Sequence, residues 1–168
     1  MRLTTLLLLC SLLVVPAAFA AGRANGDGVF ELNGVNAQRV IITGARGAIW
    51  GQIDKGRLVV TDLNLDDNLA PQVSGADQIQ WTPDPSVMIY SGKNIHFRFS
   101  GGKYRFSIVG SGIDVTAVGV GQASLVGDPD VVDTGYYAVD DAKWTSVPLL
   151  KKVVPFGVQP VTTGLPGV

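Results

Sequence analysis

The chain has one cysteine, one histidine and one glutamate in 168 residues, and only 16% of its residues are charged. These scarcities exclude a zinc site built from Cys and His, a disulfide framework and a Cys–His nucleophile pair. Lys and Arg number 13 against 14 Asp and Glu, so no large net charge draws the whole chain to nucleic acid. With 46% hydrophobic residues, the chain can bury a core and is not disordered by composition.

The first twenty residues have the pattern of a secretory signal peptide. One basic residue precedes an apolar run from Leu3 to Val15, Pro16 ends the run, and Ala18-Phe19-Ala20 fits a signal peptidase site. The run is shorter than the roughly 20 apolar residues of a transmembrane helix. A retained anchor and lipidation of Cys10 are the alternatives, but Cys10 lies inside the run and follows leucines instead of a small residue. We expect cleavage near Ala20, and a mature protein without a transmembrane span that is secreted, periplasmic or associated with the cell envelope.

Short runs of β-branched and aromatic residues, separated by Gly, Asn or Asp, fill residues 21–147. This pattern predicts a single all-β domain: an antiparallel two-sheet β-sandwich or flattened barrel of short strands with Gly-rich turns. The motif Phe30-x-Leu32-x-Gly34 is echoed by Phe106-x-Ile108-x-Gly110, which leaves a short β-solenoid as the alternative. Residues 148–168 contain four prolines and are predicted to form an extended C-terminal arm.

The strongest local prediction is a β-hairpin around Gly101-Gly102. The runs 95–100 and 103–108 alternate apolar and polar residues on either side of the two glycines. In this register Phe99 faces Tyr104, Phe97 faces Phe106 and Ile95 faces Ile108, and these six side chains are predicted to lie in the core.

Charge is segregated along the chain. Residues 58–92 carry five acids and no base, residues 93–113 carry four bases and no acid, and residues 114–142 carry six acids and no base. The predicted hairpin therefore has a basic hairpin face made of His96, Arg98, Lys103 and Arg105. Arg98 would lie opposite Arg105, where like charges destabilise a sheet. Either a neighbouring Asp or water offsets this repulsion, or the face binds an anionic envelope polymer through bidentate hydrogen bonds.

The sequence also contains two further candidates for a binding site. Asp62, Asn64 and Asp66 place oxygen ligands at alternate positions, which suits calcium, although Asp67 and Val73 occupy positions where a calcium loop needs Gly and Glu. A solvated turn is the alternative. Three tryptophans, Trp50, Trp81 and Trp144, are either a sugar-binding platform or residues of the core or its rim.

No catalytic constellation is recognisable. His96 is the only histidine and lies within an expected strand, and the chain contains neither a G-x-S-x-G motif nor a Walker motif. We therefore expect a non-enzymatic exported β domain with a structural or binding role at the cell envelope, whose partner is an anionic polymer or another envelope protein and not nucleic acid. The alternatives are a calcium-dependent adhesion or carbohydrate-binding module and, less favoured, a small Asp-dependent hydrolase.

Overall fold

The protein, seen in a computed structural model that describes residues 24–158, is built almost wholly of β-strands. In chain order the elements are β1 (Gly28–Asp62), the 3-10 helix η1 (Leu65–Asp67), β2 (Gln72–Trp81), β3 (Val87–Ser100), β4 (Tyr104–Gly127), β5 (Tyr136–Val139), β6 (Thr145–Ser146) and β7 (Lys152–Phe156). All pairings are antiparallel, in one open sheet ordered β2-β3-β1-β4-β7, with β5 beside β1 and β6 beside β5. The prediction of antiparallel all-β structure is confirmed, whereas a sandwich of two separate sheets is not confirmed.

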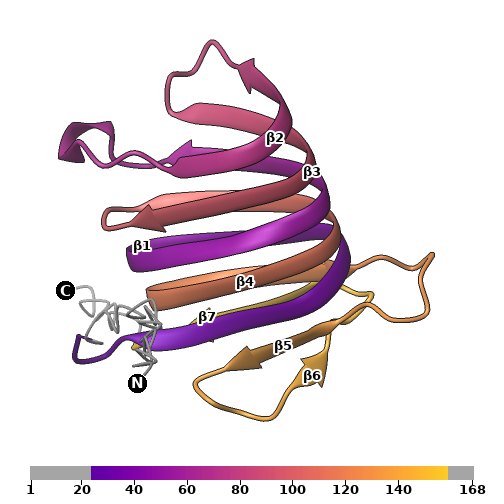
Figure 1. The fold of residues 1–168 in the computed structure, drawn as a ribbon. Helices are drawn as coiled ribbons and strands as arrows, with labels where there is room; N and C mark the ends of the chain where they lie inside the picture. Colours follow the sequence, from indigo (N-terminus) through magenta and orange to yellow (C-terminus); the bar gives the residue numbers. More distant parts are fainter. Residues whose placement is uncertain (1–23, 159–168) are drawn as a thin grey trace, which may run out of the picture.

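The two longest strands, β1 and β4, pair with each other twice. Ala117 of β4 pairs with both Phe30 and Ile49 of β1, and Ile108 pairs with both Val40 and Leu58. The strand β4 therefore lies between an earlier and a later stretch of β1, and the two strands coil together. Figure 1 shows the outcome, in which the strands sweep around one side of the molecule so that one part of the sheet faces another.

The curled sheet has two arms that share a core. The Trp50 arm consists of residues 28–33 and 48–53 of β1, 95–100 of β3, 113–119 of β4, and β5. The Arg105 arm consists of residues 37–44 and 56–62 of β1, 104–110 and 120–127 of β4, and β7. Phe97 pairs with Gly51 of β1, and Phe106 pairs with Val60 of β1. In an extended strand, Gly51 and Val60 would be about 30 Å apart. Because the two phenylalanine rings lie 5.3 Å apart between centroids, the sheet must fold back between them.

Glycines line the bend. Across adjacent strands, Gly92 pairs with Gly56, Gly56 with Gly110, Gly110 with Ala37 and Ala37 with Gly127. A Cβ on Gly110 would lie 2.8 Å from the Cα of Gly56 and closer still to a backbone carbonyl of β1, and Gly110 has φ +148°. The close approach of these backbones explains why glycines sit inside long strands as well as in turns.

The predicted burial of six core side chains is confirmed, but the predicted hairpin is wrong. Ile95, Phe97, Phe99, Tyr104, Phe106 and Ile108 are all buried. However, β1 lies between β3 and β4, so these two strands do not pair. Gly101 and Gly102, with φ of 91° and 66°, instead connect the Trp50 arm to the Arg105 arm. The predicted pairs Phe99–Tyr104 and Phe97–Phe106 are in contact across the core, with centroids 5.6 and 5.3 Å apart.

Part of the Pro-rich tail belongs to the sheet. Residues 152–156 form β7, an edge strand beside residues 121–125 of β4. Pro155 is tolerated there because an edge strand leaves some backbone N–H groups unpaired in any case. The rest of the tail, residues 159–168, lies outside the described residues, as do the predicted signal peptide and Cys10.

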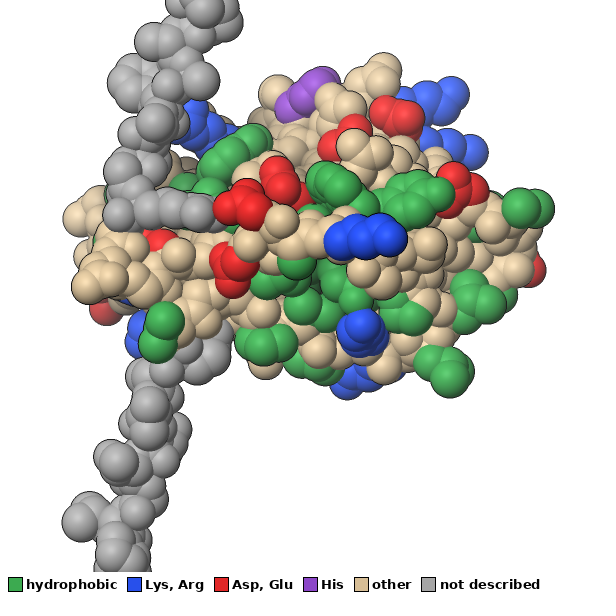
Figure 2. Space-filling view, turned by 90° about the horizontal axis from the view of Figure 1, so that it is seen from below, with side chains coloured by type: hydrophobic (Ala, Val, Ile, Leu, Met, Phe, Trp, Pro, Cys, Tyr) green, Lys and Arg blue, Asp and Glu red, His purple; other side chains and the backbone are tan. Residues whose placement is uncertain are grey.

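The two ends of the sheet differ in how they are protected. Among residues 24–158, no strand pairs beyond β2 at one end or β7 at the other. Figure 2 views the molecule from below, the side of β5, β6 and β7, where apolar side chains are exposed among charged ones. Proline in β7 and the register shift between Ser74 and Gln78 in β2 hinder edge-to-edge pairing.

Candidate functional site: a basic groove

The structure separates the residues of the predicted basic hairpin face. Arg98 lies on the Trp50 arm, between Trp50 and Gln72. Arg105 lies on the Arg105 arm, between Thr43 and Thr61. The two arginines are therefore not opposite each other, and the expected like-charge repulsion does not arise. The physical reason is the inserted stretch of β1, which takes the hydrogen bonds that a hairpin would have used.

The other two members of that predicted face are also apart. His96 is exposed on the Trp50 arm and pairs with Gln52 and Ser74. Lys103 precedes β4, and its backbone carbonyl accepts a hydrogen bond of 3.0 Å from the N–H of Leu63. Only His96 and Arg98 share an outer face.

The calcium candidates lie in the turn that follows β1. The Asp62 carboxylate accepts a hydrogen bond of 2.9 Å from the backbone N–H of Asn64, and the Asn64 amide donates one of 3.1 Å to Asp67. Asp66 is exposed in η1. In residues 24–158, no group of three or more His, Cys, Asp or Glu side chains is arranged to hold a metal ion. The local hydrogen bonds are those of an Asx-type turn.

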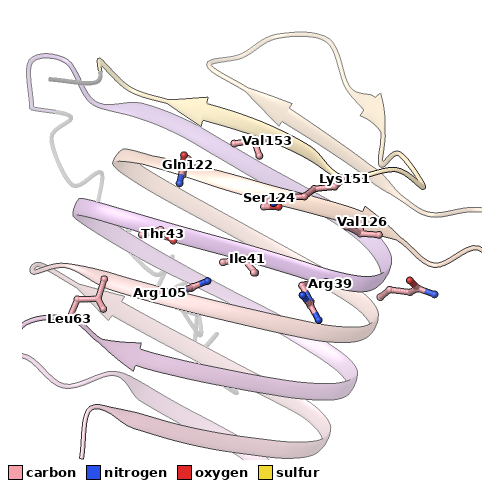
Figure 3. Close-up of a pocket in the computed structure, with 11 residues that line it drawn as sticks. Arg39, Ile41, Thr43, Leu63, Arg105, Gln122, Ser124, Val126, Lys151 and Val153 are labelled. Carbon is pink, nitrogen blue, oxygen red and sulfur yellow. The ribbon is translucent and has the colours of Figure 1, made fainter. Parts of the chain in front are cut away.

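The basic residue Arg105 belongs instead to a groove on the outer surface of the Arg105 arm. This basic groove has a volume of about 680 Å³, and its cations are Arg39 of β1, Arg105 of β4 and Lys151 just before β7. Its other lining residues are uncharged: Gln38, Ile41, Thr43, Leu63, Gln122, Ser124, Val126 and Val153. Figure 3 shows these side chains along neighbouring strands, with the cations around the polar and apolar floor.

Among the described residues, no carboxylate neutralises the basic groove. Within the described part of the chain, Arg39, Arg105 and Lys151 form no ion pair, whereas Arg46 pairs with Asp27 at 2.9 Å. Arg57, which pairs with Val109, adds a fourth exposed cation to the same outer surface. Exposed guanidinium groups without internal partners keep their donors available for an external anion.

Sequence reasoning identified Arg105 but missed Arg39 and Lys151. Arg39 and Arg105 are 66 positions apart in the sequence, and they come together only because residues 37–44 of β1 pair with residues 104–110 of β4. The alternation of buried and exposed residues around Arg39 could have shown that it points outward. No local signal shows which strand lies beside it.

None of the three tryptophans is in the core. Their exposed fractions are 41% for Trp50, 79% for Trp81 and 45% for Trp144. Trp50 and Trp144 line one groove on the Trp50 arm, whereas Trp81 lies on the edge strand β2.

Comparisons with protein-family models, with curated proteins and with solved structures each find no match to this chain. Across residues 24–158, no helix has the length and apolar character needed to cross a membrane. The function is therefore inferred from the side chains that the fold brings together.

Proposed function

We propose that this protein is an exported, non-enzymatic β domain of the cell envelope that binds an anionic polymer through the basic groove. The observation that carries the proposal is the convergence of Arg39 of β1, Arg105 of β4 and Lys151, which precedes β7, with no acid among the lining residues. Export is supported by the signal-peptide pattern of residues 1–20.

The spacing of the cations favours an extended ligand. Arg105 is opposite Thr43, which is four residues from Arg39 and hence about 13 Å away along an extended strand. Arginines with that backbone spacing can each hold a different anionic group. A polymer with repeated anionic groups supplies one to each guanidinium, which can form bidentate hydrogen bonds with a phosphate or carboxylate.

The uncharged floor of the basic groove suits the same ligand. Ile41, Val126 and Val153 offer apolar contact to the backbone of a polymer, while Thr43, Gln122 and Ser124 offer hydrogen bonds to its hydroxyl groups. Apolar walls also reduce the solvent screening of the nearby cations.

The test is binding of the full-length protein to a linear polyphosphate and to polygalacturonate, by fluorescence anisotropy across a salt series. The Arg39→Glu/Arg105→Glu variant is compared with Lys93→Glu/Arg98→Glu, a matched control that makes the same change in net charge outside the groove. We expect the groove variant to bind at least about tenfold more weakly, which corresponds to ~1.4 kcal/mol, and the affinity of the unaltered protein to fall as salt rises.

The control separates a site from a general charge effect. Equal weakening in both double variants would mean that net charge alone governs binding. Absence of binding to both polyanions at low salt would refute the proposal altogether.

A further inference from the structure

The outer surface of the Trp50 arm carries a second groove of a different chemical character. It has a volume of about 560 Å³, and we call it the tryptophan groove. Trp50 of β1 and Trp144, from the segment between β5 and β6, are its exposed aromatic residues. Its polar lining side chains are Glu31, Asn33, Gln52, His96, Asp114 and Thr116.

The exposure of its two indoles needs an explanation. Each tryptophan leaves more than two fifths of its surface in water, at 41% for Trp50 and 45% for Trp144. Large aromatic side chains are normally buried because their contact area contributes strongly to stability. Two exposed indoles contribute less to stability than buried ones would. Because they lie in one groove, they offer a ligand a joint apolar surface.

The polar floor is held in place by hydrogen bonds. The Asp114 carboxylate accepts two hydrogen bonds. Its Oδ2 accepts one of 2.9 Å from the Gln52 side-chain amide, and its Oδ1 accepts one of 2.7 Å from the backbone N–H of Gly34. This arrangement fixes the Gln52 side chain and leaves its Oε1 free to accept a hydrogen bond from a ligand. The side chains of Glu31 and His96 form no hydrogen bond within residues 24–158, so both have capacity for ligand hydroxyl groups.

The register brings these groups close together. Trp50 pairs with Thr116, which pairs with Glu31, so an aromatic ring, a hydroxyl and a carboxylate follow one another across three neighbouring strands. The adjacent row joins Gln52 and Asp114. Strands are about 4.8 Å apart, so one sugar unit can reach side chains from adjacent strands.

The charge of the tryptophan groove selects against anions. Glu31 and Asp114 contribute two carboxylates, and the lining contains no Lys or Arg. An acidic sugar or a phosphate would be repelled there, whereas a neutral sugar can stack its C–H face on an indole and donate hydroxyl hydrogens to the carboxylates. The lining is too polar for a purely apolar ligand.

We propose that the tryptophan groove binds a neutral oligosaccharide, with Trp50 and Trp144 as stacking surfaces and Glu31, Gln52 and Asp114 as the hydrogen-bonding floor. This site is separate from the basic groove and does not depend on its function, because the two lie on opposite outer surfaces of the curled sheet.

The experiment measures intrinsic tryptophan fluorescence and calorimetric binding of the full-length protein with chitotetraose, cellotetraose, maltotetraose and the anionic tetragalacturonate. We expect at least one neutral tetrasaccharide to change the emission and to bind more tightly than tetragalacturonate. In the Trp50→Ala/Trp144→Ala variant this binding should weaken at least about tenfold. Trp81→Ala is the matched control, because Trp81 is even more exposed but lies outside the groove.

The outcomes distinguish this proposal from the preceding one. Retained saccharide binding in Arg39→Glu/Arg105→Glu shows that the tryptophan groove acts by itself. Failure of all three neutral tetrasaccharides to bind at millimolar concentration overturns the proposal. Equal loss in the Trp81→Ala control, or full binding by a folded Trp50→Ala/Trp144→Ala variant, overturns it as well.

Discussion

Crosslinking tests the insertion of β1 between β3 and β4 directly. In the structure, Ser107 of β4 pairs with Val59 on one side and with Ile41 on the other. The hairpin predicted from sequence would instead place Ser107 opposite His96. Cysteines introduced at Val59 and Ser107 should form a disulfide, because paired residues of antiparallel strands have Cα atoms about 4.5–5.5 Å apart, within the range a disulfide spans. The background is Cys10→Ser, so the introduced cysteines are the only thiols.

The expected stabilisation follows from the loop that the crosslink closes. Val59 and Ser107 enclose about 48 residues, for which the loss of chain entropy in the unfolded state amounts to about 4 kcal/mol. Measured values are more often about 2–4 kcal/mol because the native state bears some strain. For a domain of this size, each 1 kcal/mol raises Tm by roughly 2–4 °C. We therefore expect an increase of several degrees that disappears when a reductant is added.

Mobility on non-reducing gels and thermal melts with and without reductant give the result. The Ile41→Cys/Ser107→Cys pair should also crosslink, because β4 lies between two stretches of β1. The His96→Cys/Ser107→Cys pair should remain reduced in the folded protein. Efficient crosslinking of that control, together with failure of the Val59 pair, would refute the double pairing and restore the hairpin.

Three further perturbations test the core and the bend. Phe106→Ala should lose about 3–5 kcal/mol of unfolding free energy in urea melts, because the ring is fully buried; a loss below about 1 kcal/mol would contradict the aromatic packing. Tyr104 has a buried hydroxyl without a hydrogen-bond partner among the described residues, so Tyr104→Phe should leave stability unchanged or raise it by about 1 kcal/mol. Burial also raises the pKa of Tyr104 above its ordinary value of 10.0. Above pH 10.0 this tyrosine loses its proton in the unfolded chain but keeps it in the folded protein, so stability falls as pH rises. Tyr104→Phe should reduce this fall. Gly110→Ala should cost more stability than Gly34→Ala in melts of both variants, since both glycines have positive φ but only Gly110 faces a crowded backbone; equal costs would argue against close packing at the bend.

Local alternation was sufficient to predict β structure and much of the core, but the expected short strands were wrong, because the separate runs between residues 29 and 61 belong to the single strand β1. Phe97, Phe99, Tyr104 and Phe106 are buried as expected, because the two-residue period of a strand decides which side chains face inward whatever strand lies beside it. The aromatic contacts were also predicted correctly, although the rings meet across the core and not between paired strands.

Strand pairing could not be predicted in the same way. Gly101-Gly102 fits a tight hairpin turn and a connection between two arms equally well, since both need positive φ at the glycines. The choice depends on residues 48–62 of β1, which pair with β3 on one side and with β4 on the other. Such partners are dozens of residues away in sequence, and no local pattern identifies them.

The distribution of charge on the folded protein differs from its distribution along the chain, and this difference explains why the predicted basic hairpin face does not form. The bends of β1 and β4 carry each strand from one arm to the other, so a block of bases in the sequence is divided between two surfaces. On the outer surface of the Arg105 arm, β1 and β4 present Arg39, Arg57 and Arg105 and no acid; on that of the Trp50 arm, they present Glu31 and Asp114 and no base. The same two strands thus build a cationic surface and an acidic one. Arg98 of β3 also lies on the outer surface of the Trp50 arm, beside Trp50, but it does not line the tryptophan groove. An anionic polymer is therefore attracted to the basic groove and repelled by the carboxylates of the tryptophan groove, which is the physical basis for assigning the two grooves to different ligands.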